Sequence, residues 1–302
     1  MTTWKSRTAR RRASRPRTAA AVMAAAALCS GLLGVAPAVA ATPVAATAAP
    51  APPPSMPPVA APAANGPICW YGACYDYVSG HQWTDTTGAQ VLMKIEAPVV
   101  NPARTGEHSL QEIALQNTAR TSTVEIGWTV DPELNGDSRP HLFVYHWVDG
   151  QESCYNGCGF VQVSPAVQPG MPLPPHAAAS FAIRNIHGDW WTFLDGLPVG
   201  YFPGSLWNGT YRSAQLVSVF GEVAENTADT PSCTQMGDGR YGTDGGSSWI
   251  RDYRIDGTAD RPNLTVSATS PTHYDAGAVT ATSFRLGGPG TGACTTAAST
   301  TG

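Results

Sequence analysis

The sequence predicts an all-β fold, a sandwich or a barrel, on two observations. Charged residues make up only 13% of the 302 residues, whereas Gly, Pro, Thr and Trp are frequent, which is typical of extracellular β domains. Short runs of alternating apolar and polar residues recur with turn signals between them. Outside the N-terminal segment, no long run has the helical period together with helix start and stop signals. Many short strands with regular turns therefore favour a sandwich or barrel.

The N-terminal segment, residues 1–40, is predicted to be a secretion signal. A basic region precedes an apolar stretch from about Ala19 to Val35, and residues 38–40 form an A-x-A cleavage site. The apolar stretch is rich in Ala and short for a bilayer, so a transmembrane anchor is not expected. The Arg cluster at residues 10–12 leaves both the twin-arginine and the general export route open. We therefore expect a secreted, extracellular protein.

Residues 41–66 are predicted to be an extended linker, because only small residues, Pro, Val and Met occur there apart from one Asn. The folded domain is expected to span residues 67–302. Seven of the 18 basic residues lie in the first 17 positions, which leaves 11 basic against 22 acidic residues and a mature charge of about −11. An acidic body argues against nucleic acid and anionic membranes as partners.

The strands of this domain are predicted from runs with a period of two residues. They are expected within residues 80–95, 109–116, 123–130, 141–147, 160–163, 179–184, 190–194, 199–202, 214–224 and 247–255.

Two glutamates stand out because each lies in a strand-like run. Glu125 lies in the middle of residues 123–130, on the polar side of an alternating pattern, and Glu222 follows a β-rich run and a Gly. A solvated outer face would also explain Glu125. If the two strands are neighbours in one sheet, the two carboxyl groups can share a proton or divide acid and base roles.

Six cysteines remain after the predicted signal, which contains Cys29. An even number in an exported chain implies disulfides, although 15 pairings are possible. The spacing favours two local loops and leaves one long-range pair, so that the expected bonds are Cys69–Cys74, Cys154–Cys158 and Cys233–Cys294. Neither C-x-x-C nor H-E-x-x-H occurs, and we expect no metal and no cofactor.

Several short motifs occur together in a fixed order. They are Glu125-Ile126-Gly127-Trp128-x-Val130, Pro132-Glu133-Leu134-x-Gly136-Asp137, Cys154-Tyr155-Asn156, Gly159-Phe160-Val161-Gln162, Asp189-Trp190-Trp191, Gly200-Tyr201-Phe202-Pro203, Gly221-Glu222-Val223 and Thr234-Gln235-Met236-Gly237. Together they resemble the neprosin family of glutamic peptidases, and the Cys69–Cys74 segment is similar to bacterial, secreted members.

The resemblance implies a fold of two curved antiparallel sheets, a β-sandwich with a cleft across one face. It also implies an endopeptidase that cuts after proline in acid, with catalytic glutamates at Glu125 and Glu222. Many members have Cys where His273 stands here, bridged to the last Cys. Our hypothesis is that Cys294 instead pairs with Cys233, which would tether residues 259–302 to the fold.

Three further residues are candidates for substrate binding. Trp128 and Tyr145 could form an aromatic wall for a proline ring, or could simply pack in the core. Gln235 could offer an amide to the substrate or bond to nearby backbone. The expected partner is a proline-containing peptide or protein, and we expect a monomer. A glycoside hydrolase, which also needs two carboxylates, and an inactive carbohydrate-binding or wall-associated sandwich are the alternatives.

Overall fold

The computed structural model describes residues 66–70, 72–228 and 230–294. The predicted signal and nearly all of the predicted linker therefore lie outside the described residues. Apart from loops and turns, the described chain forms strands, and its two short helices are α1 (Pro132–Asn135) and the 3-10 helix η1 (Gly204–Trp207). The all-β prediction is confirmed.

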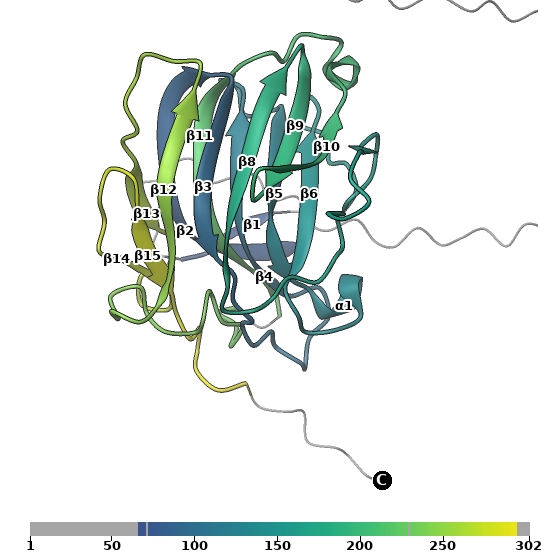
Figure 1. Cartoon of the computed structure of the whole chain (residues 1–302). Coiled ribbons are helices and arrows are strands. Elements are labelled where there is room, and N and C mark those ends of the chain that lie inside the picture. The colour runs from purple at the N-terminus through teal and green to yellow at the C-terminus, as the bar shows by residue number, and fades with distance from the viewer. Residues whose placement is uncertain (1–65, 71, 229, 295–302) are drawn as a thin grey trace, which may run out of the picture. The chain divides into compact units, whose positions relative to one another are not determined.

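The described strands form two antiparallel sheets that face one another, as Figure 1 shows with β3, β8 and β9 in front of β4, β5 and β6. The first sheet has the order β1-β2-β11-β4-β5-β6, with β13 paired to β2, and the second has the order β14-β15-β12-β3-β8-β9-β10-β7. The strands of the first sheet are β1 (Ile68–Trp70), β2 (Ala73–Thr86), β4 (His108–Gln116), β5 (Thr123–Val130), β6 (His141–Trp147), β11 (Ala214–Asn226) and β13 (Thr265–Ala268). Those of the second are β3 (Gly88–Lys94), β7 (Val161–Gln162), β8 (Ala178–Ile186), β9 (Asp189–Leu194), β10 (Leu197–Phe202), β12 (Ser248–Asp256), β14 (Asp275–Gly277) and β15 (Phe284–Gly287). The sandwich prediction is therefore confirmed as well.

The main hydrophobic core fills the space between the sheets. Strand β5 contributes Val124, Ile126, Trp128 and Val130 to it, and all four side chains are fully buried. Successive side chains of a strand point to opposite faces, so these four residues project into the sandwich and Glu125 projects away from it.

The opposite face of the first sheet is buried too, which the sequence pattern did not predict. All eight residues of β5 and all nine of β4 are buried. A second, mostly aromatic cluster lies on this side, and its members are Tyr75, Tyr77, Leu110, Ala114, Phe143, Tyr145, Trp147, Phe220 and Ala224. The alternative of a solvated outer face for Glu125 is thus wrong, because this aromatic layer, rather than water, surrounds its strand.

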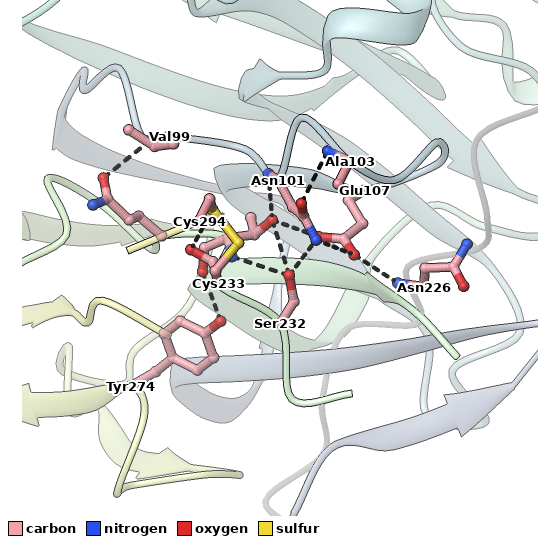
Figure 2. The surroundings of a disulfide bond; sticks show 11 residues. Val99, Asn101, Ala103, Glu107, Asn226, Ser232, Cys233, Tyr274 and Cys294 are labelled. Atoms are coloured by element: carbon pink, nitrogen blue, oxygen red, sulfur yellow. Dashed lines mark hydrogen bonds between the residues drawn. A yellow bond between two sulfur atoms is a disulfide. The ribbon is translucent and has the colours of Figure 1, made fainter. Parts of the chain in front are cut away.

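The C-terminal part of the fold is fixed by a long-range disulfide, Cys233–Cys294, shown in Figure 2. The other two disulfides close the local loops Cys69–Cys74 and Cys154–Cys158. These are the three pairs that the cysteine spacing favours.

Close to the long-range disulfide, the buried Glu107 carboxylate accepts hydrogen bonds from the hydroxyls of Ser232 and Thr234 (Figure 2). Glu107 directly precedes β4, so these bonds fix the start of that strand.

Candidate active site

Glu125 and Glu222 lie on the same face of the same sheet. Strand β4 separates their strands and pairs with both: Glu125 lies opposite Ala114, and Glu222 lies opposite Leu110. Ala114 and Leu110 are four positions apart, so their side chains share one face of β4 and both glutamates project to that side. Both glutamates have no exposed surface. The fold therefore brings together, on one sheet face, two carboxyl groups that are 97 residues apart in the sequence.

A third buried carboxyl group, Glu112, shares this face. It lies on β4, opposite Gly127 of β5 and Phe220 of β11, and it is fully buried. Burial raises its pKa well above the ordinary value of 4.5, and the charges of Glu125 and Glu222 raise it further. Glu112 lies within the predicted strand at residues 109–116 but is not among the candidate site residues predicted from the sequence.

The Glu222 carboxylate is held by a buried histidine. His108 Nε2 lies 3.1 Å from Glu222 Oε1, and the other ring nitrogen, Nδ1, lies 3.8 Å from Asp131 Oδ2. Burial lowers the pKa of His108. The hydrogen bond to Glu222 and the negative charges of Glu222, Asp131 and Glu107 raise it by more, so the net shift of this pKa is upward. His108 therefore places a buried positive charge, when protonated, between the carboxyl groups of Glu222 and Asp131.

The position of Asp131 follows from the local sequence. Asp131 directly follows β5 and caps helix α1, where its side chain accepts hydrogen bonds from the backbone N–H groups of Glu133 and Leu134. Pro132 at the first helical position and Gly136 at the C-cap define this single turn. The Pro-Glu-Leu-x-Gly motif thus serves to place a carboxylate near His108.

Glu125 lies among aromatic side chains of β6. The indole N–H of Trp147 donates a hydrogen bond to Glu125 Oε1 at 3.2 Å, and Tyr145 lies directly opposite Glu125 in the register. The Tyr145 hydroxyl accepts a hydrogen bond from the Ser153 backbone N–H, 3.0 Å away. Burial and then the charge of Glu125 raise the pKa of Tyr145, so this hydroxyl stays neutral.

Tyr77 occupies the corresponding position beside Glu222, as its partner on β2. Its ring packs edge-on against Phe220, with 5.7 Å between the ring centroids. Burial and then the charge of Glu222 raise the pKa of Tyr77 well above 10.0. A neutral tyrosine therefore stands next to each of the two glutamates.

Two of the proposed substrate-binding residues lie elsewhere. Trp128 is fully buried between the sheets, on the face of β5 opposite to Glu125, and its indole N–H donates to the Lys94 carbonyl. Gln235 bonds to a loop: its side-chain oxygen accepts from the Val99 N–H and its backbone N–H donates to the Val99 carbonyl. Tyr145 is the one of the three that shares the glutamate face.

Within the described residues, no group of three or more His, Cys, Asp or Glu side chains is arranged to hold a metal ion. Nor does this part of the chain contain a helix long and apolar enough to cross a membrane.

Comparison with protein families gives a match over residues 105–289, which include every buried acidic group described above, and the matching family is Neprosin. The chain belongs to the Neprosin family. This membership makes the protein a glutamic-type endopeptidase that acts on peptide substrates.

The solved structures that resemble this neprosin chain include scytalido-glutamic peptidase with a transition-state analogue inhibitor. Identity to it is 9% with a TM-score of 0.43, and the match covers 71% of this chain and 98% of that one. SCP-B, of the Eqolisin family, in complex with the tripeptide Ala-Ile-His has 9% identity and a TM-score of 0.35 over 71% and 98% of the two chains. The β-glucanase of Bacillus licheniformis has 10% identity and a TM-score of 0.32 over 54% and 79%. At these scores we infer nothing about function from the three structures.

Proposed function

We propose that this neprosin-family protein is a secreted endopeptidase that hydrolyses bonds on the carboxyl side of proline in acid, with Glu125 and Glu222 as its catalytic pair. The observation that carries the proposal is the common location of the two carboxyl groups. They come from distant strands, project from one sheet face on either side of β4, and are both withdrawn from water. Burying one carboxylate is costly, and burying two close together is justified most readily by chemistry that needs them.

The surroundings of the two glutamates support a division of roles. We assign the general base to Glu222, because the buried His108, whose own pKa is raised, lies 3.1 Å from Glu222 Oε1 and can hold a positive charge beside it. Ionised Glu222 takes a proton from a water molecule as the water oxygen attacks the peptide carbonyl carbon. Protonated Glu125 polarises the carbonyl oxygen and then gives its proton to the leaving nitrogen, so that the C–N bond breaks and an acid and an amine are released.

This division of roles requires a bell-shaped dependence of the rate on pH. The acidic limb reports protonation of Glu222, and the alkaline limb reports ionisation of the acid partner. Because the carboxyl groups interact, both limbs describe the coupled set rather than single residues. We expect an optimum in acid, and a rate that continued to rise to neutral pH would contradict the pair.

The preference for proline is inferred from the family, and the location of Tyr145 is compatible with it. A proline ring packs well on a flat aromatic surface, and Tyr145 and Trp147 flank Glu125 with ring centroids 5.7 Å apart. The assay uses two peptides that differ only in Pro or Ala before the scissile bond. Equal cleavage of both would remove the proline preference and leave the peptidase assignment intact.

The experiment that tests the proposed function is the replacement of each glutamate by the isosteric amide. Glu125→Gln and Glu222→Gln should each lower peptide cleavage in acid by at least about 100-fold, the usual contribution of a positioned acid or base. Their circular dichroism spectra should match the native protein. Glu152→Gln, at an exposed glutamate, is the matched control and should keep full activity. An active Glu125→Gln protein would end the assignment.

A further inference from the structure

Glu112 occupies the position between the two proposed catalytic glutamates. Its pairing partner on β5 is Gly127, which is two residues from Glu125. Its pairing partner on β11 is Phe220, which is two residues from Glu222. Each glutamate is thus its diagonal neighbour on the same face, where side chains of this length can interact. Glu112 is the one acidic residue of β4.

The backbone at Gly127 leaves room for this side chain. A Cβ atom at Gly127 would lie 2.7 Å from the Cβ of Glu112 and 2.1 Å from the carbonyl oxygen of Gln111. Any residue other than Gly would therefore displace β4 or Glu112. The Gly in the Glu-Ile-Gly-Trp motif is explained by this close approach.

Neither carboxyl oxygen of Glu112 has a hydrogen-bond partner in the described part of the chain, although the side chain is completely buried. Leaving a buried polar group without a hydrogen bond is unfavourable, and proteins normally avoid it. Glu125 and Glu222, by contrast, receive hydrogen bonds from Trp147 and His108. Of the three carboxyl groups, Glu112 is therefore the one that receives no hydrogen bond from the residues that the structure describes.

The protonation state of Glu112 follows from this environment. Burial and the charges on both sides raise its pKa well above the ordinary value, so that in acid it is a neutral carboxylic acid. A carboxylic acid has one O–H donor and one carbonyl acceptor, on two different oxygens. It can therefore accept a proton on one oxygen while it releases a proton from the other.

The proposed hydrolysis ends with the protonation states of Glu125 and Glu222 exchanged. After one turnover, Glu222 carries the proton taken from water and Glu125 has lost its own. We propose that Glu112 carries a proton from Glu222 back to Glu125 and so restores the catalytic pair. One Glu112 oxygen accepts the proton of Glu222, the other releases its proton to Glu125, and Glu112 is neutral before and after. This inference rests on the proposed function.

The test is the Glu112→Gln protein, which keeps the size of the side chain but cannot pass a proton between its two ends. The first turnover, measured with enzyme in excess over peptide, should keep its rate within about 2-fold. Steady-state kcat should fall by at least about 10-fold with KM little changed, which gives a burst of one product per enzyme.

Two further variants serve as controls for this test. Glu112→Met, of similar length, should give the same burst and covers the case in which the amide misfolds. Glu225→Gln makes the same change at a buried carboxyl group that faces the other side of β11, and it should show no burst. An unchanged kcat in Glu112→Gln, or a first turnover slowed as much as kcat, would overturn the relay. A native protein that cleaves no peptide would instead overturn the proposed function.

Discussion

Replacing His108 by Gln tests the electrostatic arrangement at Glu222. The amide can still donate a neutral hydrogen bond to Glu222, so the change removes mainly the positive charge. With an effective dielectric constant of about 20, the 3.1 Å contact to Glu222 and the 3.8 Å contact to Asp131 amount to about 5 and 4 kcal/mol before desolvation. Burial of the three groups offsets most of this, which leaves a net effect of about 2 kcal/mol.

The loss of stability should depend on pH in a definite direction. The pKa of His108 is raised in the folded protein, so its contribution is fully present below its ordinary value of 6.5. It disappears as the pH rises through the folded pKa. The stability difference between the native protein and His108→Gln should therefore be large at pH 5.5 and small at pH 9.

The measurement is urea unfolding followed by tryptophan fluorescence at both pH values. At pH 5.5 the variant should also melt about 5 °C lower, given the usual relation between stability and melting temperature for a domain of this size. A stability difference that is equal at the two pH values, or larger at pH 9, would refute the charged pair.

Other substitutions test the remaining parts of the site and its support. Gly127→Ala should cost more than about 2 kcal/mol of stability and abolish cleavage, because the new Cβ would lie 2.1 Å from the Gln111 carbonyl; a stable, active variant in thermal melts and peptide assays would contradict the close approach. Cys294→Ser removes a disulfide between cysteines 61 residues apart and should lower the free energy of unfolding, measured in urea, by about 4 kcal/mol. It should also make the C-terminal segment from residue 259 more sensitive to proteases. Burial raises the pKa of Glu225 to about 8, so the stability of the native protein should fall as the pH rises from about 4.5 to 8. Glu225→Gln should remove that decline. A decline of the same size in the variant would assign it to other groups.

The alternating pattern of residues 123–130 determined more than the strand itself. It placed Glu125 and Trp128 on opposite faces, and the structure has them there, with Trp128 between the sheets. A candidate site that contains both residues therefore conflicts with the period of its own strand. Tyr145 escapes this conflict because it pairs directly with Glu125 across β5 and β6.

The burial of the glutamate face could not be predicted from the same pattern. A strand that alternates between apolar and polar residues normally has one face in water. Here the polar face is covered by aromatic residues from the next strand, β6, and from β2 and β11, which are distant in the sequence. The pattern of one strand carries no information on what other strands place in front of it.

By itself, the sequence determined the all-β class, the main strands, the two local cysteine loops and two glutamates in strand-like runs, because these depend on local periodicity and spacing. Only the tertiary structure decided that β4 lies between β5 and β11, in a register that aligns Ala114 with Glu125 and Leu110 with Glu222. That register put Glu112 between the two glutamates and His108 against Glu222. Register between distant strands is fixed by packing over the whole sheet, and no local run of residues encodes it.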